Sequence, residues 1–329
     1  MRILSGVKPT GRPHIGNYLG AIRQHIALQN EGHECLFFVA DYHALTTVKN
    51  KEEMLSYRKG IVLDYLALGL DPAKVTFFYQ SAIPEHTELA WILSCITPHG
   101  LLERAHAWKD ALAKGNREMN VGLFTYPVLM AADILIYNAN AVPVGQDQKQ
   151  HVEIARDIAE KFNSIYGETF VLPEPRIEKD VATIMGTDGQ KMSKSYSNTI
   201  SIFDDESVIK KQVMGIKTAS IDLKDKMPIE NDTILSLYKE FASKKELDEL
   251  KDAYSAGGFG YGKAKEALLT KLLAFFADAR KRRKDLEAKN IDGIMDEGAK
   301  KARILAQKTM EIVHNKTGLG NAYSLSSLQ

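Results

Sequence analysis

The sequence predicts an α/β protein in which a Rossmann-like parallel sheet is followed by an all-helical C-terminal domain. Continuous apolar runs of strand length, such as residues 34–40 and 75–80, alternate in the first half with segments of helical spacing. Runs that are apolar on both faces are typical of parallel strands covered by helices on both sides. From about residue 200 onward, charged and apolar residues mix at helical spacing and strand-like runs are scarce. We therefore expect one domain over residues 1–190 and a second over residues 191–329.

The expected elements of the first half follow one another along the chain. Strands are expected over residues 2–7, 34–40, 75–80 and 140–144, and helices over residues 17–29, 52–70 and 149–162. In an open parallel sheet, ligands bind beyond the carboxyl ends of the strands, where the N-termini of helices point. The polar residues that follow the strands, among them Asp41-Tyr42-His43, are therefore expected at one site. In the second half we expect helices within residues 234–254, 263–291 and 296–314.

Composition restricts the classes of protein to consider. Of the 329 residues, 44% are apolar and 26% are charged, which is typical of a globular protein that buries a core. The longest apolar runs are too short to span a bilayer, and the N-terminus has no signal region. We therefore expect a cytoplasmic protein with no membrane partner.

Cysteine, histidine and basic residues give weaker indications. The two cysteines and nine histidines show no metal-ligand spacing, so we expect no disulfide framework and no metal held by the protein. The net charge of +1 does not exclude a local basic surface for nucleic acid. The five consecutive basic residues 280–284 point all round a predicted helix, which favours a solvated surface over a dedicated RNA-binding face.

The turn after the first strand is suited to bind a nucleotide. It reads Lys8-Pro9-Thr10-Gly11-Arg12-Pro13-His14-Ile15-Gly16-Asn17 and leads into a helix. Gly16 lets a ligand lie against the backbone, and the helix N-terminus offers free N–H groups to a phosphate. His14 and Asn17 can add side-chain hydrogen bonds. A structural turn with a helix cap explains this segment, taken alone, equally well.

A second motif, Lys191-Met192-Ser193-Lys194-Ser195, lies in a loop that follows Gly186, Asp188 and Gly189. Two ammonium groups three residues apart can clamp a polyphosphate. Such a clamp is most useful when it strengthens as charge develops on a leaving pyrophosphate. Taken alone, the motif is better explained as a solvated basic loop. In this order and at this separation, the two motifs indicate a site that binds ATP and transfers its adenylyl group.

The two motifs resemble the HIGH and KMSKS motifs of class I aminoacyl-tRNA synthetases. Residues 126–135 (YPVLMAADIL) and 142–151 (VPVGQDQKQH) closely resemble the tryptophanyl-tRNA synthetases of bacteria, and the resemblance extends essentially end to end. It implies an enzyme that activates L-tryptophan with ATP and Mg²⁺, and then transfers it to the 3′ end of tRNA(Trp). It also implies a homodimer, with the nucleotide and amino acid bound in residues 1–190. Residues 191–329 are implied to carry the KMSKS loop and to recognise the anticodon.

The resemblance implies a role for each matching residue. Stabilisation of phosphoryl charge is implied for His14, Lys191 and Lys194. The implied ATP site comprises Lys8, Pro9, Thr10, Gly16, Asn17, Gly145, Gln146, Asp147, Ile184, Lys191, Met192, Ser193, Lys194 and Ser195. The implied tryptophan site comprises Asp133, Tyr126, Met130, Gln148 and His43, with Asp133 accepting a hydrogen bond from the indole N–H.

The chemistry of Asp133 agrees with its implied role. A carboxylate among the apolar residues 130–135 needs a hydrogen-bond donor. Indole offers one N–H donor and no acceptor. A site built around that bond would reject phenylalanine, because the buried acceptor would be left unpaired. Without the resemblance, a structural pair between Asp133 and a nearby Lys or Arg is the better explanation.

The sequence differs from the usual pattern of this family at several positions. Lys8, Tyr42, Gln146 and Tyr196 replace the family's more usual residues, and His14 is closer to the class-wide motif than the common Thr. None of these changes deletes a group that the mechanism requires.

Three alternatives to tryptophan activation remain open. A tyrosyl-tRNA synthetase shares the fold and both motifs, although residues 130–133 favour tryptophan. A paralogue that binds or regulates without charging tRNA is the alternative from another class, and the intact motifs argue against it. A small-molecule nucleotidyltransferase would explain neither residues 191–195 nor the helical half.

Overall fold

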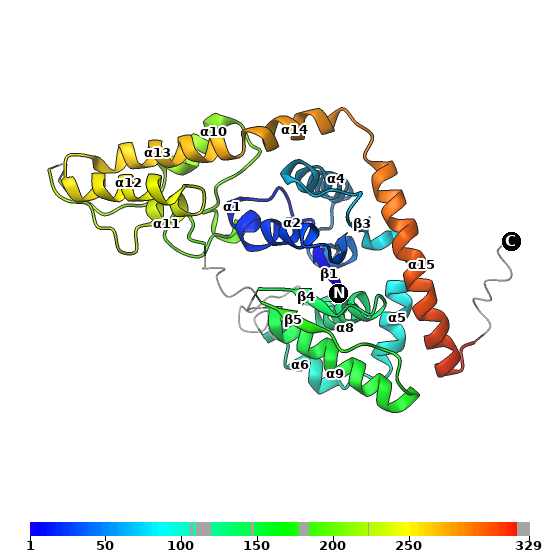
Figure 1. Ribbon diagram of the computed structural model, residues 1–329. Coiled ribbons are helices and arrows are strands. Elements are labelled where there is room, and N and C mark those ends of the chain that lie inside the picture. Colours follow the sequence, from blue (N-terminus) through cyan, green and yellow to red (C-terminus); the bar gives the residue numbers. More distant parts are fainter. Residues whose placement is uncertain (106–107, 110–119, 146–147, 178–183, 223, 321–329) are drawn as a thin grey trace.

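A five-stranded parallel sheet forms the centre of the molecule. The computed structural model describes residues 1–105, 108–109, 120–145, 148–177, 184–222 and 224–320 (Figure 1). The strands are β1 (Arg2–Val7), β2 (Glu34–Val39), β3 (Thr76–Tyr79), β4 (Ala141–Pro143) and β5 (Glu174–Arg176). They are ordered β3-β2-β1-β4-β5 and all pair in parallel, which confirms the predicted Rossmann-like sheet. The strand order changes direction between β1 and β4. Open parallel sheets bind their ligands at such a point.

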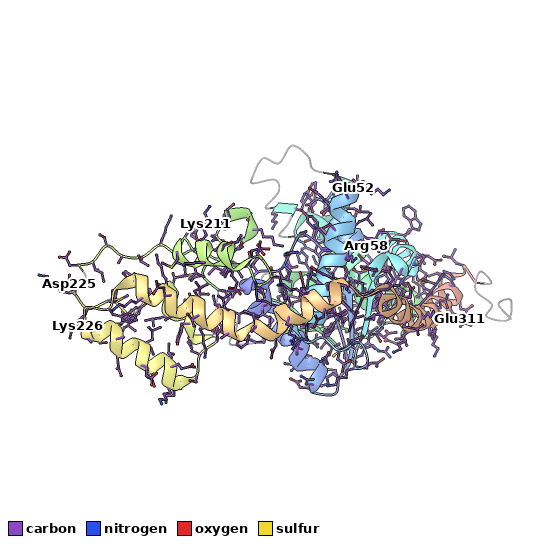
Figure 2. The ribbon with its side chains drawn as sticks, turned by 90° about the horizontal axis from the view of Figure 1, so that it is seen from above. Glu52, Arg58, Lys211, Asp225, Lys226 and Glu311 are labelled. Carbon is purple, nitrogen blue, oxygen red and sulfur yellow. The ribbon has the colours of Figure 1, made fainter. Side chains whose placement is uncertain are left out.

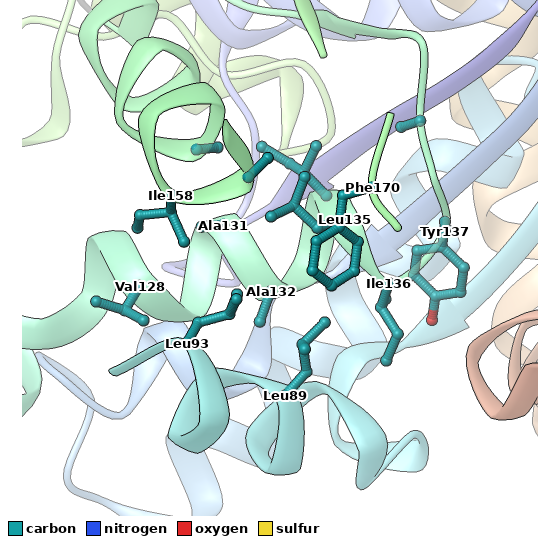
Figure 3. Close-up of a cluster of buried hydrophobic side chains, with 14 of the residues drawn as sticks. Leu89, Leu93, Val128, Ala131, Ala132, Leu135, Ile136, Tyr137, Ile158 and Phe170 are labelled. Carbon is teal, nitrogen blue, oxygen red and sulfur yellow. The ribbon is translucent and has the colours of Figure 1, made fainter. Parts of the chain in front are cut away.

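Two apolar cores cover the two faces of the sheet, because side chains alternate between the faces along each strand. Ile3, Cys35, Phe37 and Phe77 pack with residues of α2 (Arg23–Asn30) and α4 (Lys51–Leu68). The alternate residues Leu4, Leu36, Phe38 and Phe78 pack with residues of α5 (Glu85–Ser94), α8 (Val121–Leu135) and α9 (Lys149–Tyr166). Figure 3 shows the second core, in which Ala131 and Ala132 of α8 lie between Leu93 of α5 and Ile158 of α9.

Shorter helical segments connect these elements. They are α1 (Ile15–Asn17), the π-helical turn η1 (Tyr18–Ile22), α3 (Asp41–Ala44), η2 (Gln80–Ala82) and α6 (His99–Glu103). α4 begins where the Asn50 side chain accepts the N–H of Glu53 at 2.9 Å, and it ends at Gly69, whose φ is +115°. The sequence did not predict β5, since its three residues Glu174-Pro175-Arg176 are few and polar.

The second half of the chain is helical, as predicted. It comprises η4 (Lys194–Tyr196), α10 (Glu206–Met214), α11 (Thr233–Lys239), α12 (Lys244–Ala256), α13 (Gly260–Phe275), α14 (Ala277–Glu287) and α15 (Asp292–Thr317). α11 and α12 are separate because Ser243 caps α12, accepting the N–H of Glu246 and donating to its carboxylate. α10 to α13 form a lobe whose core includes Val213, Leu235, Leu268 and Phe276, and Ile15 and Leu19 of the first half pack into the same core.

The last two helices return to the sheet. α14 packs along α4, and α15 packs against β3 and α5 (Figure 1). Figure 2 shows the resulting elongated shape, with Asp225 and Lys226 at the tip of the lobe and Glu311 of α15 toward the opposite end. The domain boundary at residue 190 stays a prediction, and in space α14 and α15 lie against the first half of the chain. No helix in the described part of the chain is long and apolar enough to cross a membrane.

The expectation that residues 280–284 are solvated is wrong for two of them, Arg280, which is half-buried, and Arg283, which is buried. Arg280 donates to the carbonyl oxygens of Ile202 and Asp204 at 2.6 and 2.8 Å. Arg282 donates to the carbonyl oxygen of Ala67 at 2.9 Å, and Arg283 to the carboxylate of Asp64 at 2.6 Å. These arginines hold α14 against its neighbours, while Lys281, Arg282 and Lys284 are exposed as expected.

Candidate active site

A cavity of about 420 Å³ opens at the carboxyl ends of β1 and β4. All five residues that the resemblance implies for tryptophan line it, namely Asp133, Tyr126, Met130, Gln148 and His43. Of the residues implied for ATP, Lys8 and Gly145 also line it. Val7 of β1 pairs with Val39 of β2, so Lys8 and the turn that carries His43 leave the sheet at the same edge. Segments far apart in sequence therefore meet at one cavity.

Asp133 lies at this cavity and is only 1% exposed. Its Oδ2 atom lies 2.8 Å from His43 Nε2, and its Oδ1 atom lies 2.6 Å from His86 Nδ1 and accepts from Gln80 Nε2 at 2.8 Å. Burial by itself raises the pKa of Asp133, but the hydrogen bonds from His43 and His86 outweigh it and hold the pKa at about 2. The carboxylate is therefore ionised at neutral pH and can only accept hydrogen bonds. Within the described residues its hydrogen-bond partners are two histidines and Gln80, rather than the Lys or Arg of the structural alternative.

Sequence reasoning missed the groups behind Asp133. Gln80 follows β3 directly, at the edge of the sheet where Asp41 and His43 also lie, and that position was an available signal. Its Oε1 atom accepts the backbone N–H of Tyr42 at 3.1 Å, which fixes the orientation of the amide. His86 lies within α5 in no recognisable motif, so the sequence offered no signal for it.

Tyr126 is held by a second polar group at the cavity. Its hydroxyl is hydrogen-bonded to His151 Nε2, and His151 Nδ1 lies 2.9 Å from Gln148 Oε1. Burial raises the pKa of Tyr126, so the phenol stays protonated at neutral pH. Tyr126 and Gln148 thus belong to one hydrogen-bonded group on the wall of the cavity.

Lys8 enters the same cavity from the end of β1. Its ammonium donates to Thr46 Oγ1 at 3.0 Å, and Thr46 donates in turn to the carbonyl oxygen of His43 at 2.8 Å. Burial lowers the pKa of Lys8. Lys8 thus places a partly buried ammonium at the cavity.

The structure brings the two sequence motifs together. Lys194 Nζ donates to the carbonyl oxygen of Thr10 at 2.9 Å, and the N–H of Ile15 donates to the carbonyl oxygen of Ile200 at 3.0 Å. Met192 is buried in the same core as Ile15. Pro9 is buried, and Thr10 is exposed.

The loop of Lys191 to Ser195 is organised around Asn198, which is 1% exposed. The Asn198 amide donates to the carbonyl oxygen of Lys191 at 3.0 Å and to Asp188 Oδ1 at 2.7 Å, and its Oδ1 accepts the N–H of Ser193 at 2.7 Å. A Cβ atom at Gly186 would lie 2.4 Å from this amide, so the position requires glycine. The N–H of Met192 donates to the carbonyl oxygen of Ile184 at 2.8 Å, and the hydroxyls of Ser193 and Ser195 are 2.8 Å apart.

His14 is buried beside this loop. Burial, and then the charge of Lys194, lower the pKa of His14 to about 4, so the imidazole is neutral at neutral pH. Its Nδ1 atom has no hydrogen-bond partner among the described residues. The imidazole and the Met192 sulfur lie 3.0 and 3.3 Å from where a Cβ of Gly16 would be, so any larger residue at this position would press on both side chains. Asn17 Oδ1 accepts the backbone N–H of His14 at 3.2 Å.

A buried carboxylate faces the same motifs from α4. Asp64 is fully buried and accepts from Arg283 of α14. Burial raises the pKa of Asp64, and the charges of Arg283, Arg12 and Lys194 oppose that shift. Burial likewise lowers the pKa of Lys194, and Asp64 opposes it. Asp64 is thus the countercharge of a group of cations beside the first motif.

Some predictions fall outside these observations. Gln146 and Asp147 lie outside the described residues. Tyr196 is 60% exposed, and Tyr42 is half-buried. The described residues contain no group of three or more His, Cys, Asp or Glu side chains that could hold a metal ion.

Comparison with known proteins identifies the family of this chain. The family model of the class I tRNA synthetases for W and Y matches residues 1–277. The chain belongs to this family. It is 52% identical to the tryptophan–tRNA ligase of Fusobacterium nucleatum subsp. nucleatum, covering 98% of this chain and 99% of the relative. It is 50% identical to that of Rhodopirellula baltica, covering 97% and 100%.

Solved structures of family members show the same fold. The tryptophanyl-tRNA synthetase of Campylobacter jejuni complexed with ADP and tryptophan superposes with a TM-score of 0.92 at 47% identity, covering 97% of this chain and 100% of that one. The tyrosyl-tRNA synthetase of Archaeoglobus fulgidus complexed with L-tyrosine superposes with a TM-score of 0.65 at 22% identity, covering 86% and 90%. At that identity the likeness shows the fold alone.

Proposed function

We propose that this chain is a tryptophan–tRNA ligase whose cavity binds L-tryptophan with the indole N–H directed at Asp133. The observation that carries this proposal is the state of the Asp133 carboxylate. Two protein donors occupy Oδ1, whereas Oδ2 has His43 as its one described donor, and both Asp133 and His43 line the cavity. An ionised carboxylate with free acceptor capacity matches a ring that has one N–H donor and no acceptor. Tyr126, Met130 and Gln148 form the adjacent walls.

ATP binds between the two motifs in this proposal. Lys8, Pro9, Thr10, Gly16 and Asn17 contact it from the first motif, and Gly145, Gln146, Asp147 and Ile184 contact the ribose and adenine. Lys191 to Ser195 contact the phosphates. The contact between Lys194 and Thr10 supports this arrangement, because it places the ammonium beside the first motif before any phosphate is bound. Mg²⁺ arrives with ATP as part of the substrate.

The reaction needs positioning rather than a protein nucleophile. A carboxylate oxygen of tryptophan attacks the α-phosphorus of ATP, and the bond from that phosphorus to the bridging oxygen breaks, releasing pyrophosphate. Lys191 and Lys194 stabilise the charge that develops on the leaving phosphates. His14 is neutral at pH 7, so it contributes a hydrogen bond rather than a charge. The 2′-hydroxyl of the terminal adenosine of tRNA then attacks the carbonyl carbon of the adenylate, and AMP leaves.

The names of the relatives support the remaining assignments. Tryptophan–tRNA ligases act on tRNA, so tRNA(Trp) is the proposed second substrate, and the helices after residue 190 are the proposed anticodon-binding part. A homodimer acting in the cytoplasm is proposed by analogy with the family.

Amino-acid-dependent exchange between ATP and pyrophosphate tests the proposal. It is measured with tryptophan, with tyrosine and without amino acid, on the parent protein and on Asp133→Asn. We expect exchange with tryptophan alone, and a higher KM for tryptophan in the variant because the amide presents one acceptor fewer to the indole. Exchange with tyrosine alone would mean that tyrosine, not tryptophan, is the substrate. Exchange with neither amino acid would favour a protein that binds or regulates without catalysis.

A further inference from the structure

The side chains behind Asp133 form a continuous buried hydrogen-bonded chain. Asp133 Oδ1 lies 2.6 Å from His86 Nδ1, and His86 Nε2 lies 2.7 Å from the Tyr137 hydroxyl. His86 is 0% exposed and Tyr137 is 1% exposed, so neither group exchanges this contact for water. Figure 3 shows the Tyr137 ring at the end of the apolar cluster between α5 and α8, with its hydroxyl at the tip.

The ionisation of Asp133 places the first proton of the chain on His86 Nδ1. The carboxylate can only accept, so His86 Nδ1 carries a hydrogen and donates it. When the imidazole is neutral, its other nitrogen, Nε2, is an acceptor, and the Tyr137 hydroxyl donates to it. Tyr137 thereby selects the tautomer of His86 that points an N–H at Asp133.

Gln80 completes the arrangement from the other side. Its amide donates to the same oxygen, Asp133 Oδ1, and is itself oriented by the backbone N–H of Tyr42. The two donors on Oδ1 prevent rotation of the carboxylate about its Cβ–Cγ bond. Oδ2 therefore remains the atom beside His43. The direction of the free acceptor is thus set by groups that do not line the cavity.

We propose that Tyr137 and His86 are positioning residues for amino-acid recognition, which aim Asp133 Oδ2 at the indole N–H by fixing the tautomer of His86. This inference rests on the proposed function, since it assumes that Asp133 binds the substrate. Neither residue touches the substrate. Loss of the chain should therefore weaken tryptophan binding and leave ATP binding and the chemical step unchanged.

Tyr137 also packs in the apolar core, against Phe78 with ring centroids 5.8 Å apart. A purely structural role for its hydroxyl is the competing explanation. The experiment must therefore separate a lost hydrogen bond that acts through His86 from a general loosening of the core.

A double-mutant cycle in the exchange assay makes that separation. Tyr137→Phe keeps the ring and removes only the hydroxyl, and we expect the KM for tryptophan to rise roughly threefold to tenfold, with kcat and the KM for ATP unchanged. His86→Asn places an amide N–H near the position of Nδ1 and has no tautomer to select. In that background, Tyr137→Phe should leave the KM for tryptophan unchanged. An equal rise in both backgrounds, or no rise in the parent, would overturn the proposal.

Tyr254→Phe is the matched control. Tyr254 is fully buried in the helical lobe, and its hydroxyl donates to Asp232 at 3.3 Å, so the same atom is deleted far from the cavity. The KM for tryptophan should not change in this variant. A change equal to that of Tyr137→Phe would mean that any buried hydroxyl has the same effect, and the proposal would fail.

The tautomer can be observed directly. Nitrogen-15 NMR of the imidazoles, with His86 identified by its loss in His86→Asn, should show a protonated Nδ1 and an unprotonated Nε2. A proton on Nε2 of the parent protein would contradict the proposal. The Asp133→Asn measurement distinguishes failure of the proposed function from failure of the positioning role of Tyr137 and His86. If that variant binds tryptophan normally, the proposed function fails, whereas a defect there combined with a normal Tyr137→Phe rejects only the positioning role.

Discussion

Lys194 Nζ lies 2.9 Å from the carbonyl oxygen of Thr10, although 184 residues separate them in the chain. This contact joins the two motifs in space, whereas the sequence shows only their order and separation along the chain. Lys194 is an exposed residue, and desolvation lowers the pKa of its ammonium while the carboxylate of Asp64 opposes that shift. Lys194 is therefore already held beside the first motif when the phosphates of ATP bind.

Replacing Lys194 by Ala should lower the rate of adenylate formation about a hundredfold, because a positioned charge is lost where the pyrophosphate leaves. Tryptophan binding should change little, since Lys194 does not line the cavity of Asp133. Pre-steady-state formation of the adenylate and equilibrium binding of tryptophan measure the two effects. Lys211→Ala, which removes an exposed lysine of α10, is the control (Figure 2). Equal losses in rate and binding for Lys194→Ala would reject this assignment.

Asn198→Ala should loosen the loop of Lys191 to Ser195, because Asn198 bonds to its backbone. The substitution removes a donor to the carbonyl oxygen of Lys191 and an acceptor for the N–H of Ser193, each contributing about 1 kcal/mol. We expect kcat for exchange to fall roughly tenfold or more and the KM for ATP to rise, with the KM for tryptophan unchanged. Kinetics at varied ATP and varied tryptophan separate these effects, and a defect confined to tryptophan would contradict the role given to the loop.

His25 should make the protein less stable in mild acid. Burial lowers its pKa to about 4, whereas the unfolded chain has the ordinary value of 6.5. As the pH falls below 6.5 the unfolded state binds the proton first, so stability is lost until the pH reaches about 4. From pH 7 to pH 5 this one group should lower the free energy of unfolding by about 2 kcal/mol.

Urea unfolding at both pH values measures that difference. His25→Gln should reduce the loss between pH 7 and pH 5 by the contribution of His25, and the remaining loss includes that of His14, whose pKa is also lowered to about 4. His99→Gln replaces an exposed histidine, with 73% of its side chain accessible, and should leave the loss unchanged. The same pH dependence in His25→Gln and the parent would show that His25 is not buried as a neutral ring.

The sequence predicted the sheet because strands such as Cys35 to Val39 are buried on both faces, and this leaves a continuous apolar run. It also predicted the residues that gather at the cavity, through motifs long enough to identify a family. It could not predict the roles of His86 and Tyr137, since those roles arise where α5 meets the C-terminal end of α8, and these meet only after packing. The contacts of Arg282 and Arg283 were missed for a related reason, because a helical charge pattern does not reveal which surface the helix meets.

Gly298 allows α15 to pack closely against β3. A Cβ atom there would lie 1.8 Å from the carbonyl oxygen of Phe77 in β3, a backbone atom that cannot move without shifting the strand. Gly298→Ala should therefore lower the free energy of unfolding by about 3 kcal/mol or more. Gly293→Ala lies on the same helix with open space around it, and should be neutral or stabilising by up to about 1 kcal/mol. Urea unfolding of both variants tests this, and equal stability of the two would mean that α15 does not pack on β3 at this distance.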